Sequence, residues 1–145
     1  MLVAQILKAK DIQETVTIQP DLTIGEAAAM LSARRIGAVV VASQPGRAEG
    51  ILSERDIVRE LGRTGSEALS HPVAEFMTRK LVTCKPDDTA LQVLEKMSAG
   101  RFRHMPVLDG DKMIGLVSIG DVVQARLEEL AMENTAMEGM IMGQH

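Results

Sequence analysis

Aromatic side chains are almost missing from this chain of 145 residues, which has no tryptophan, no tyrosine and two phenylalanines, Phe76 and Phe102. Proteins that bind single-stranded nucleic acid stack the bases on aromatic side chains, and here that chemistry is scarcely available. The formal net charge of −4 also lacks the basic excess of a nucleic-acid-binding surface. We therefore expect an aliphatic core and no nucleic-acid partner.

Cysteine and long apolar runs are equally scarce. A single cysteine, Cys84, excludes an internal disulfide and is typical of a protein from a reducing cytoplasm. No apolar run approaches the roughly 20 residues that cross a bilayer, and Met1–Lys8 lacks the pattern of a signal peptide. We expect a cytoplasmic protein with no membrane partner, in which Cys84 is a small buried side chain.

The chain contains one unit twice. Pro20–Thr23 (PDLT) returns as Pro86–Thr89 (PDDT), and Gly50–Asp56 (GILSERD) returns as Gly115–Asp121 (GLVSIGD). Two copies of one unit usually pack face to face around a pseudo-twofold axis, and the cleft between them is the first place to look for a ligand. We therefore predict one compact domain made of two halves.

Each repeat is predicted to contain a strand, a helix, two strands and a second helix. Capping boxes at Thr23–Glu26 and Thr89–Gln92 predict helices over about 24–35 and 90–100. Short lead-in segments, 3–8 and 73–78, resemble each other and precede the two units. We assign residues 1–62 to repeat 1 with its N-terminal lead-in, 63–72 to a linker, 73–126 to repeat 2 and 127–145 to a C-terminal helical tail.

The C-terminal tail is rich in methionine, with Met132, Met137, Met140 and Met142 near its end. Flexible thioether side chains suit an adaptable apolar surface. Either the tail covers the core of its own chain or it contacts a second copy, and the sequence favours neither alternative.

The recurring serine and aspartate pairs, Ser53 with Asp56 and Ser118 with Asp121, close a strand and open a helix. On its own this pattern is a helix N-cap with an acid in the first turn. Its recurrence at the same point of both repeats favours a functional role. A carboxylate just past the end of a strand, at a helix start, can accept from two vicinal hydroxyls, as in many ribose sites.

Basic residues stand before one of the strands only. Arg103 and His104 occupy the positions at which repeat 1 has Gly37 and Ala38. Together with Arg55, near the other helix start, they are candidate donors to a phosphate. Because the repeats differ in charge here, we expect two sites that are not equivalent.

Motifs for catalysis and metal binding are missing. The chain has neither Gly-x-Gly-x-x-Gly nor a phosphate-binding loop with lysine. His71, His104 and His145 share no ligand spacing with one another or with Cys84, so we expect no metal. Without a nucleophile and base pair, we expect a protein that is not an enzyme and has no catalytic cofactor.

At these residues the sequence resembles a tandem pair of CBS (cystathionine-β-synthase-type) domains, from about Val3 to Ala125. The resemblance rests on the double Gly-x-x-Ser-x-x-Asp motif, the two Thr-x-x-Pro-Asp-x-Thr starts and Arg103–Val107. The chain is most similar to small stand-alone CBS-pair proteins. The resemblance implies an α/β (α+β) fold of two β-α-β-β-α repeats packed around a pseudo-twofold axis, with a C-terminal helix, and a disc-like homodimer.

The resemblance also implies a ligand. CBS pairs commonly bind AMP, ADP, ATP, NAD(H) or S-adenosylmethionine, and we expect an adenine nucleotide, AMP first, as a regulatory ligand. By position, Asp56 and Asp121 would hold ribose, and Arg103 and His104 would bind phosphate. The expected ligand-binding residues are Thr17, Gly37, Ala38, Ser53, Arg55, Asp56, Thr83, Arg103, His104, Pro106, Ser118 and Asp121.

Three functional hypotheses follow. The first is a non-catalytic sensor that binds an adenosine-containing ligand between the repeats and signals in trans to an unknown protein partner. The second is a ligand-independent dimeric interaction protein with vestigial clefts. The third, a nucleotide-acting enzyme, is disfavoured because no activated nucleophile is present. Retention of serine and aspartate in both repeats favours the sensor, although helix capping alone would also retain them.

Overall fold

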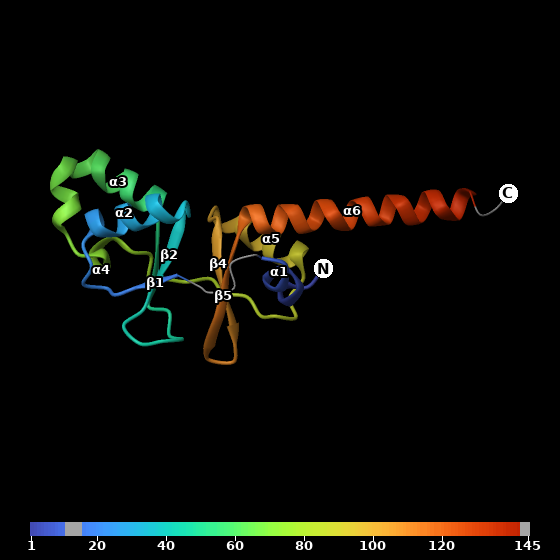
Figure 1. The fold of residues 1–145 in the computed structure, drawn as a ribbon, viewed down its shortest axis with the longest axis horizontal. Coiled ribbons are helices and arrows are strands. Elements are labelled where there is room, and N and C mark those ends of the chain that lie inside the picture. Colours follow the sequence, from blue (N-terminus) through green and yellow to red (C-terminus); the bar gives the residue numbers. More distant parts are fainter. Residues whose placement is uncertain (11–15, 143–145) are drawn as a thin grey trace.

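The computed structural model describes residues 1–10 and 16–142, and it contains the predicted pair of repeats (Figure 1). Repeat 1 consists of β1 (Thr17–Ile18), α2 (Ile24–Arg34), β2 (Ala38–Val41), β3 (Gly50–Ser53) and α3 (Glu54–Thr64). Repeat 2 consists of α5 (Ala90–Gly100), β4 (His104–Asp109), β5 (Lys112–Ser118) and α6 (Ile119–Met142). Three short helices complete the fold: α1 (Val3–Ala9), the 3-10 helix η1 (Gly65–Ser70) and α4 (Val73–Phe76).

The two sheets follow one plan. In repeat 1, β2 pairs antiparallel with β3 and parallel with β1, where Ile18 lies opposite Val41. In repeat 2, β4 pairs antiparallel with β5, and the strand equivalent to β1 is reduced to a parallel bridge between Cys84 and Val107. The expected order of strand, helix, two strands and helix is therefore confirmed in repeat 1, and in repeat 2 it is followed with the first strand reduced to that bridge.

Cys84 is buried, as expected, with 2% of its surface exposed. Burial raises the pKa of its thiol to about 11, and the nearby Asp88 carboxylate acts in the same direction. The thiol therefore stays protonated at neutral pH, so Cys84 contributes packing rather than reactivity.

Both capping boxes form at the predicted helix starts. The Thr23 hydroxyl accepts from the Glu26 amide at 3.2 Å, and the Thr89 hydroxyl accepts from the Gln92 amide at 3.1 Å. The two helices also end alike, because Arg35 and Arg101 adopt the left-handed conformation at the C-caps of α2 and α5, with φ of 54° and 55°. The first helices of the two repeats thus begin and end in the same way.

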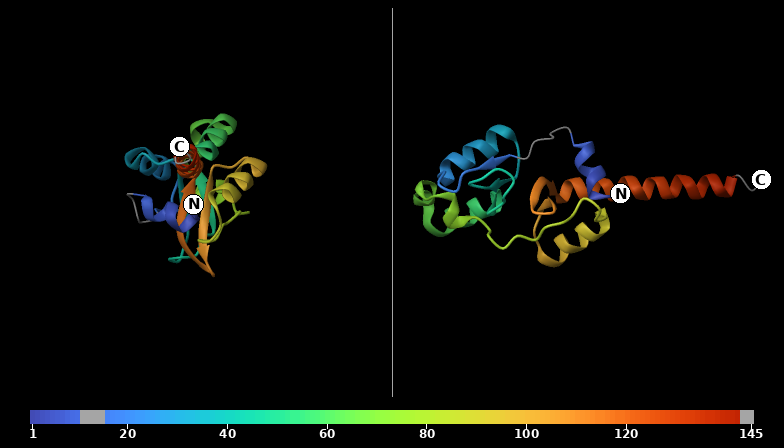
Figure 2. Two further views of the ribbon diagram at one scale, coloured as in Figure 1. Left: turned by 90° about the vertical axis from the view of Figure 1, so that its right-hand side faces the viewer. Right: turned by 90° about the horizontal axis from the view of Figure 1, so that it is seen from below.

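Each repeat has its own core, completed by the lead-in helix that precedes the other repeat in the chain. The Val3 amide of α1 donates to the Asp88 carbonyl of repeat 2 at 2.9 Å, whereas the Val73 amide of α4 donates to the Leu22 carbonyl of repeat 1 at 2.7 Å. Val3 and Ile6 accordingly belong to the core of repeat 2. Figure 2 shows α1 beside α6, away from the rest of repeat 1. The assignment of residues 1–62 to one unit follows the chain order, but α1 packs on repeat 2.

The predicted linker is structured. Helix α3 extends to Thr64, and Gly65–Ser70 forms the 3-10 helix η1, in which Ala68 is fully buried. The carbonyl oxygen of Leu69 would lie 3.2 Å from a Cβ placed at Gly25, so α2 and η1 pack closely. The segment therefore packs against repeat 1 through Ala68, while its other residues are exposed or partly exposed.

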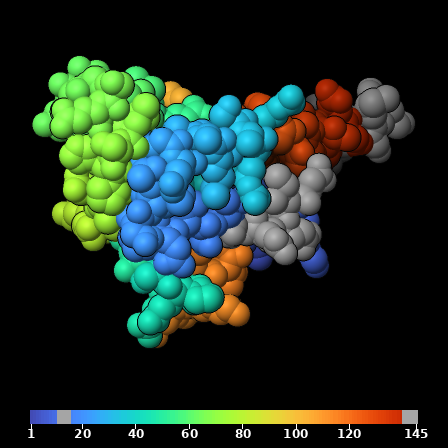
Figure 3. Space-filling model, turned by 60° about the vertical axis from the view of Figure 1, so that its left-hand side comes forward, coloured from blue at the N-terminus to red at the C-terminus, as the bar shows by residue number. Residues whose placement is uncertain are grey.

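The C-terminal helix forms as predicted, and its exposure bears on the two alternatives for the tail. The start of α6 packs into the core of repeat 2 through Val122 and Ala125. Its C-terminal part extends away from both repeats (Figures 1 and 3), and residues 131–139 are all exposed. Leu127, Leu130, Met132 and Met137 are 57%, 46%, 67% and 60% exposed. Residues 131–139 of the tail therefore do not cover the core of their own chain.

Candidate functional site

A cavity of about 710 Å³ lies between the two repeats. Its walls come from α1, the start of β2, the end of β5 and the first turn of α6. The predicted site residues in its lining are Gly37, Ala38, His104, Ser118 and Asp121. Both repeats thus contribute to one site, as expected for a cleft at a pseudo-twofold axis.

Strand pairing explains why these residues meet. His104 lies directly opposite Ser118 in the β4–β5 ladder, and α6 begins at the next residue, which places Asp121 in its first turn. Across the axis, a Cβ placed at Gly37 would lie 3.6 Å from the His104 ring. The starts of β2 and β4 therefore contact each other across the interface between the repeats.

Asp121 combines a charged carboxylate with an open acceptor. Its Oδ2 accepts from the Ser118 amide at 2.8 Å and pairs with the Lys10 ammonium at 2.9 Å. Partial burial opposes ionisation of Asp121, but the bonds from Lys10 and Ser118 outweigh it and hold the pKa of the carboxyl below its usual value. Within residues 1–10 and 16–142, no hydrogen bond reaches Oδ1. Asp121 can therefore accept from a hydroxyl in the cavity.

His104 faces the same cavity. Burial lowers the pKa of its imidazole, and the nearby Asp121 carboxylate offsets this only in part. The ring is therefore neutral at neutral pH, with one nitrogen as a donor and the other as an acceptor.

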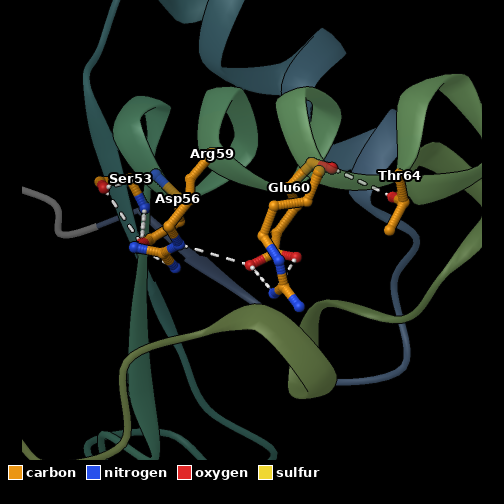
Figure 4. A network of polar contacts seen from close by, with 6 residues as sticks. Ser53, Asp56, Arg59, Glu60 and Thr64 are labelled. Carbon is orange, nitrogen blue, oxygen red and sulfur yellow. Dashed lines mark hydrogen bonds and ion pairs between the residues drawn. The ribbon is translucent and has the colours of Figure 1, made fainter.

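The equivalent aspartate of repeat 1 is in a different state. Asp56 Oδ2 accepts from the Ser53 amide at 2.9 Å and from the Ser53 hydroxyl at 3.0 Å, while Oδ1 pairs with Arg59 at 3.1 Å. Figure 4 shows this network continuing along α3 to Glu60. The Asp56 side chain is 8% exposed, compared with 24% for Asp121. Both Asp56 oxygens are thus already used within the chain.

The other predicted residues do not line the cavity. Arg55 and Arg103 are exposed, and Pro106 is buried within β4. Thr17 is exposed in β1, although its neighbour Val16 belongs to the lining. The ligand roles assigned to the following residues remain predictions: Thr17, Ser53, Arg55, Asp56, Thr83, Arg103 and Pro106.

Sequence reasoning missed three basic residues of the cavity, Lys8, Lys10 and Arg35. Lys8 and Lys10 lie at the end of α1, and they reach the cavity because α1 packs on repeat 2. The similarity of 3–8 to 73–78 was the available signal, and it carries no information on which repeat each lead-in contacts. Arg35 reaches the cavity from the end of α2.

The described residues contain neither a metal-binding cluster nor a membrane-spanning helix. No group of histidine, cysteine, aspartate and glutamate side chains in residues 1–10 and 16–142 is arranged to hold a metal ion. Within the same ranges, no helix combines the length and the apolarity needed to cross a membrane.

The CBS domain family matches this chain twice, over residues 9–63 and 73–128. The mitochondrial CBS domain-containing protein CBSX3 of Arabidopsis thaliana is 36% identical over 128 residues, which cover 85% of this chain and 62% of the relative. The chain also spans 26% of the Arabidopsis protein CBSCBSPB2. It therefore accounts for less than two thirds of these relatives.

Solved structures share the fold. The CBS-domain protein ATU1752 of Agrobacterium tumefaciens has a TM-score of 0.83 and 42% identity, covering 87% of this chain and 99% of its own. PAE2072 of Pyrobaculum aerophilum, complexed with AMP, has a TM-score of 0.76 and 27% identity, with 91% and 99% covered. The CBS domain pair of MJ0100, complexed with 5′-methylthioadenosine and S-adenosylmethionine, has a TM-score of 0.77 and 25% identity, with 89% and 98% covered.

Proposed function

The chain belongs to the CBS domain family, as a pair of these domains, and from this premise we propose that it binds an adenosine-containing ligand in the cavity at Asp121. CBS-domain pair proteins are generally regulatory and non-catalytic. The observation that carries the proposal is the Asp121 carboxylate, ionised, open at Oδ1 and placed at a helix start. This is the arrangement that accepts from the two hydroxyls of a ribose.

The size and walls of the cavity support a nucleoside. Its volume of about 710 Å³ is typical of small-ligand sites. Leu7, Ile36, Ile114 and Leu116 give it an apolar wall on which a base can lie, and His104 offers a donor and an acceptor nearby. AMP is the first ligand to test among AMP, ADP, ATP, NAD(H) and S-adenosylmethionine.

Binding is proposed to act on a protein partner in trans. A ligand that contacts Gly37 and Asp121 together links the two repeats, and it shifts the protein toward the arrangement of the repeats for which its affinity is higher. The size of the signal is limited by the difference between its affinities for the two arrangements.

The exposed face of α6 supports a second function, the interaction with another copy of the chain. Leu127, Leu130 and Met137 are 57%, 46% and 60% exposed on α6, whose residues 131–139 are all exposed. We propose a homodimer, and sedimentation velocity tests it. Leu127→Glu together with Leu130→Glu is expected to shift the protein to monomer, whereas an unchanged dimer would exclude this face.

A thermal-shift panel tests the ligand proposal. Circular dichroism is the suitable readout, because the chain has no tryptophan or tyrosine. A ligand at about 100 times its dissociation constant stabilises the fold by roughly 2.7 kcal/mol, which is several degrees for a domain of this size. We expect shifts with adenine compounds and none with guanine nucleotides. A flat panel at millimolar concentration would contradict the proposal.

A further inference from the structure

The cavity carries an excess of positive charge. Three cationic residues, Lys8, Lys10 and Arg35, line it, and Asp121 is the one carboxylate of its lining in the described chain. His104 adds no charge at neutral pH, because burial lowers the pKa of its ring. Clefts lined by one sign of charge concentrate ligands of the opposite sign.

Lys10 is held in place with a donor to spare. Its ammonium donates to the Leu116 carbonyl at 2.8 Å and pairs with Asp121 Oδ2 at 2.9 Å. Lysine has three N–H donors, so one remains for an oxygen in the cavity. Lys10 and Asp121 together therefore offer a charged donor next to an open acceptor, which suits a ligand that carries both an anionic oxygen and hydroxyl groups.

Arg35 approaches from the other repeat. It closes α2 in the left-handed conformation, so its backbone is fixed while its side chain lies at the cavity. Arg101 has the same conformation at the end of α5, but it does not line the cavity. The conformation therefore serves to end the helices in both repeats, and the position at the cavity is specific to Arg35.

We propose that this cavity selects the 5′-phosphorylated members of the adenosine class, with Lys8, Lys10 and Arg35 as the residues that bind the phosphate. The proposal rests on the proposed function and narrows it. S-adenosylmethionine carries a sulfonium cation, and 5′-methylthioadenosine is uncharged at the same position. 5′-Methylthioadenosine has no anionic oxygen, and S-adenosylmethionine has only the carboxylate at the far end of its methionine moiety, beside an ammonium group, whereas AMP carries its phosphate directly on the 5′ oxygen.

Titration calorimetry on the full chain tests this selectivity. We expect AMP to bind about tenfold or more tightly than adenosine, because a hydrogen bond to a charged group contributes roughly 1.5–3 kcal/mol. 5′-Methylthioadenosine should behave like adenosine, and S-adenosylmethionine should bind more weakly than AMP. The advantage of AMP should shrink as salt is raised, since salt screens exposed charges.

Matched variants test the residues. Arg35→Gln should weaken AMP by about threefold or more while changing adenosine by less than about twofold, because only the phosphate contact is lost. Arg101→Gln is the control, with the same backbone conformation and no contact with the cavity, and should leave both affinities unchanged. Lys8→Gln should also weaken AMP while leaving adenosine nearly unchanged, as Arg35→Gln does.

The outcomes separate the two proposals. Equal affinities for AMP and adenosine, or tighter binding of S-adenosylmethionine than of AMP, would overturn the phosphate selectivity while leaving an adenosine site in place. Equal losses in Arg35→Gln and Arg101→Gln would overturn the assignment of Arg35. Absence of binding by all four compounds would overturn the proposed function and this inference together.

Discussion

Asp56 and Asp121 occupy the same position in the two repeats, yet their carboxylates have different partners. Each accepts from the serine amide three residues before it, so each caps its helix. Arg59, one turn further along α3, pairs with the second oxygen of Asp56. The equivalent residue of α6 is Gln124, which donates to Glu128 instead. One residue outside the motif therefore leaves Asp121 open and Asp56 occupied.

The two lead-in segments also differ in how they contact the strands that precede the two aspartates. In repeat 1, Ile51 exchanges two backbone hydrogen bonds with Thr78, at 3.0 and 2.8 Å, so the chain after α4 lies against β3. In repeat 2, α1 stays helical to Ala9, and the equivalent carbonyl, that of Leu116, accepts from the Lys10 ammonium. Lys10 and Leu116 both line the cavity. Two copies of one motif thus have different surroundings because of their neighbours.

Replacing each aspartate in turn should produce the largest difference between the two repeats. Asp121→Ala should weaken AMP binding by roughly tenfold to a hundredfold, because it removes hydrogen bonds to a charged group. Asp56→Ala should bind AMP as the parent does while losing about 0.5–2 kcal/mol of unfolding free energy with the helix cap. Titration calorimetry measures AMP binding, and urea unfolding measures the free energy of unfolding. Equal losses of binding in the two variants would refute the assignment.

The glycines of the two motifs should differ in stability. A Cβ at Gly50 would lie 2.6 Å from Met77 Sδ and 2.9 Å from the Thr78 carbonyl oxygen, which is fixed in the backbone. At Gly115 it would meet only the end of the Leu7 side chain, which can rotate. We expect Gly50→Ala to cost about 1–3 kcal/mol and Gly115→Ala less than about 1 kcal/mol, as measured by urea unfolding. The reverse order would contradict the packing of the lead-in segments.

Replacing Gln124, one turn after Asp121 in α6, tests whether the open oxygen of Asp121 binds the ligand. Gln124→Arg gives Asp121 the partner that Asp56 has, so the guanidinium should compete with ligand hydroxyls and weaken AMP by about threefold to tenfold. Stability should change by less than about 1 kcal/mol, because the new ion pair is near the surface. Gln124→Ala is the control and should bind normally. Unchanged affinity in Gln124→Arg would show that the open oxygen is not used.

His104 should produce the smallest effect, on the pH dependence of stability. Its pKa is lowered in the folded state, so the unfolded chain binds more protons as pH falls below about 6.5. The free energy of unfolding should therefore decrease from about pH 7.5 to about pH 5.5, and less so in His104→Gln. Urea unfolding at both values measures the difference between the two proteins. The same pH dependence of unfolding free energy in the parent and in His104→Gln would contradict the burial of a neutral imidazole.

The local signals in the sequence identified the fold. The capping threonines Thr23 and Thr89, the β-rich runs and the repeated Ser-x-x-Asp motif each specify structure within a few residues, and the helices and strands form where they predict. The meeting of Gly37 with Ser118 and Asp121 followed from the duplication, because repeats of one unit pack around a common axis.

The cations of the cavity could not be predicted in this way. Lys8 and Lys10 reach it through packing of α1 on repeat 2, a contact between the two ends of the chain that no local pattern encodes. The occupied state of Asp56 depends on Arg59, which in sequence is one of many charges on an exposed helix face. Arg103 shows the opposite case, since its charge suggested a phosphate contact, but the side chain is exposed and outside the cavity.

Amide shifts in a ¹H–¹⁵N NMR titration with AMP test the central claim most directly, because they report on both aspartates in one experiment. We expect the largest shifts at Gly37, Ser118, Gly120 and Asp121, saturating with one ligand per chain, and small shifts at Ser53 and Asp56. Comparable shifts at both Ser-x-x-Asp motifs, or larger ones at Asp56, would contradict the claim that the cavity at Asp121 is the ligand site.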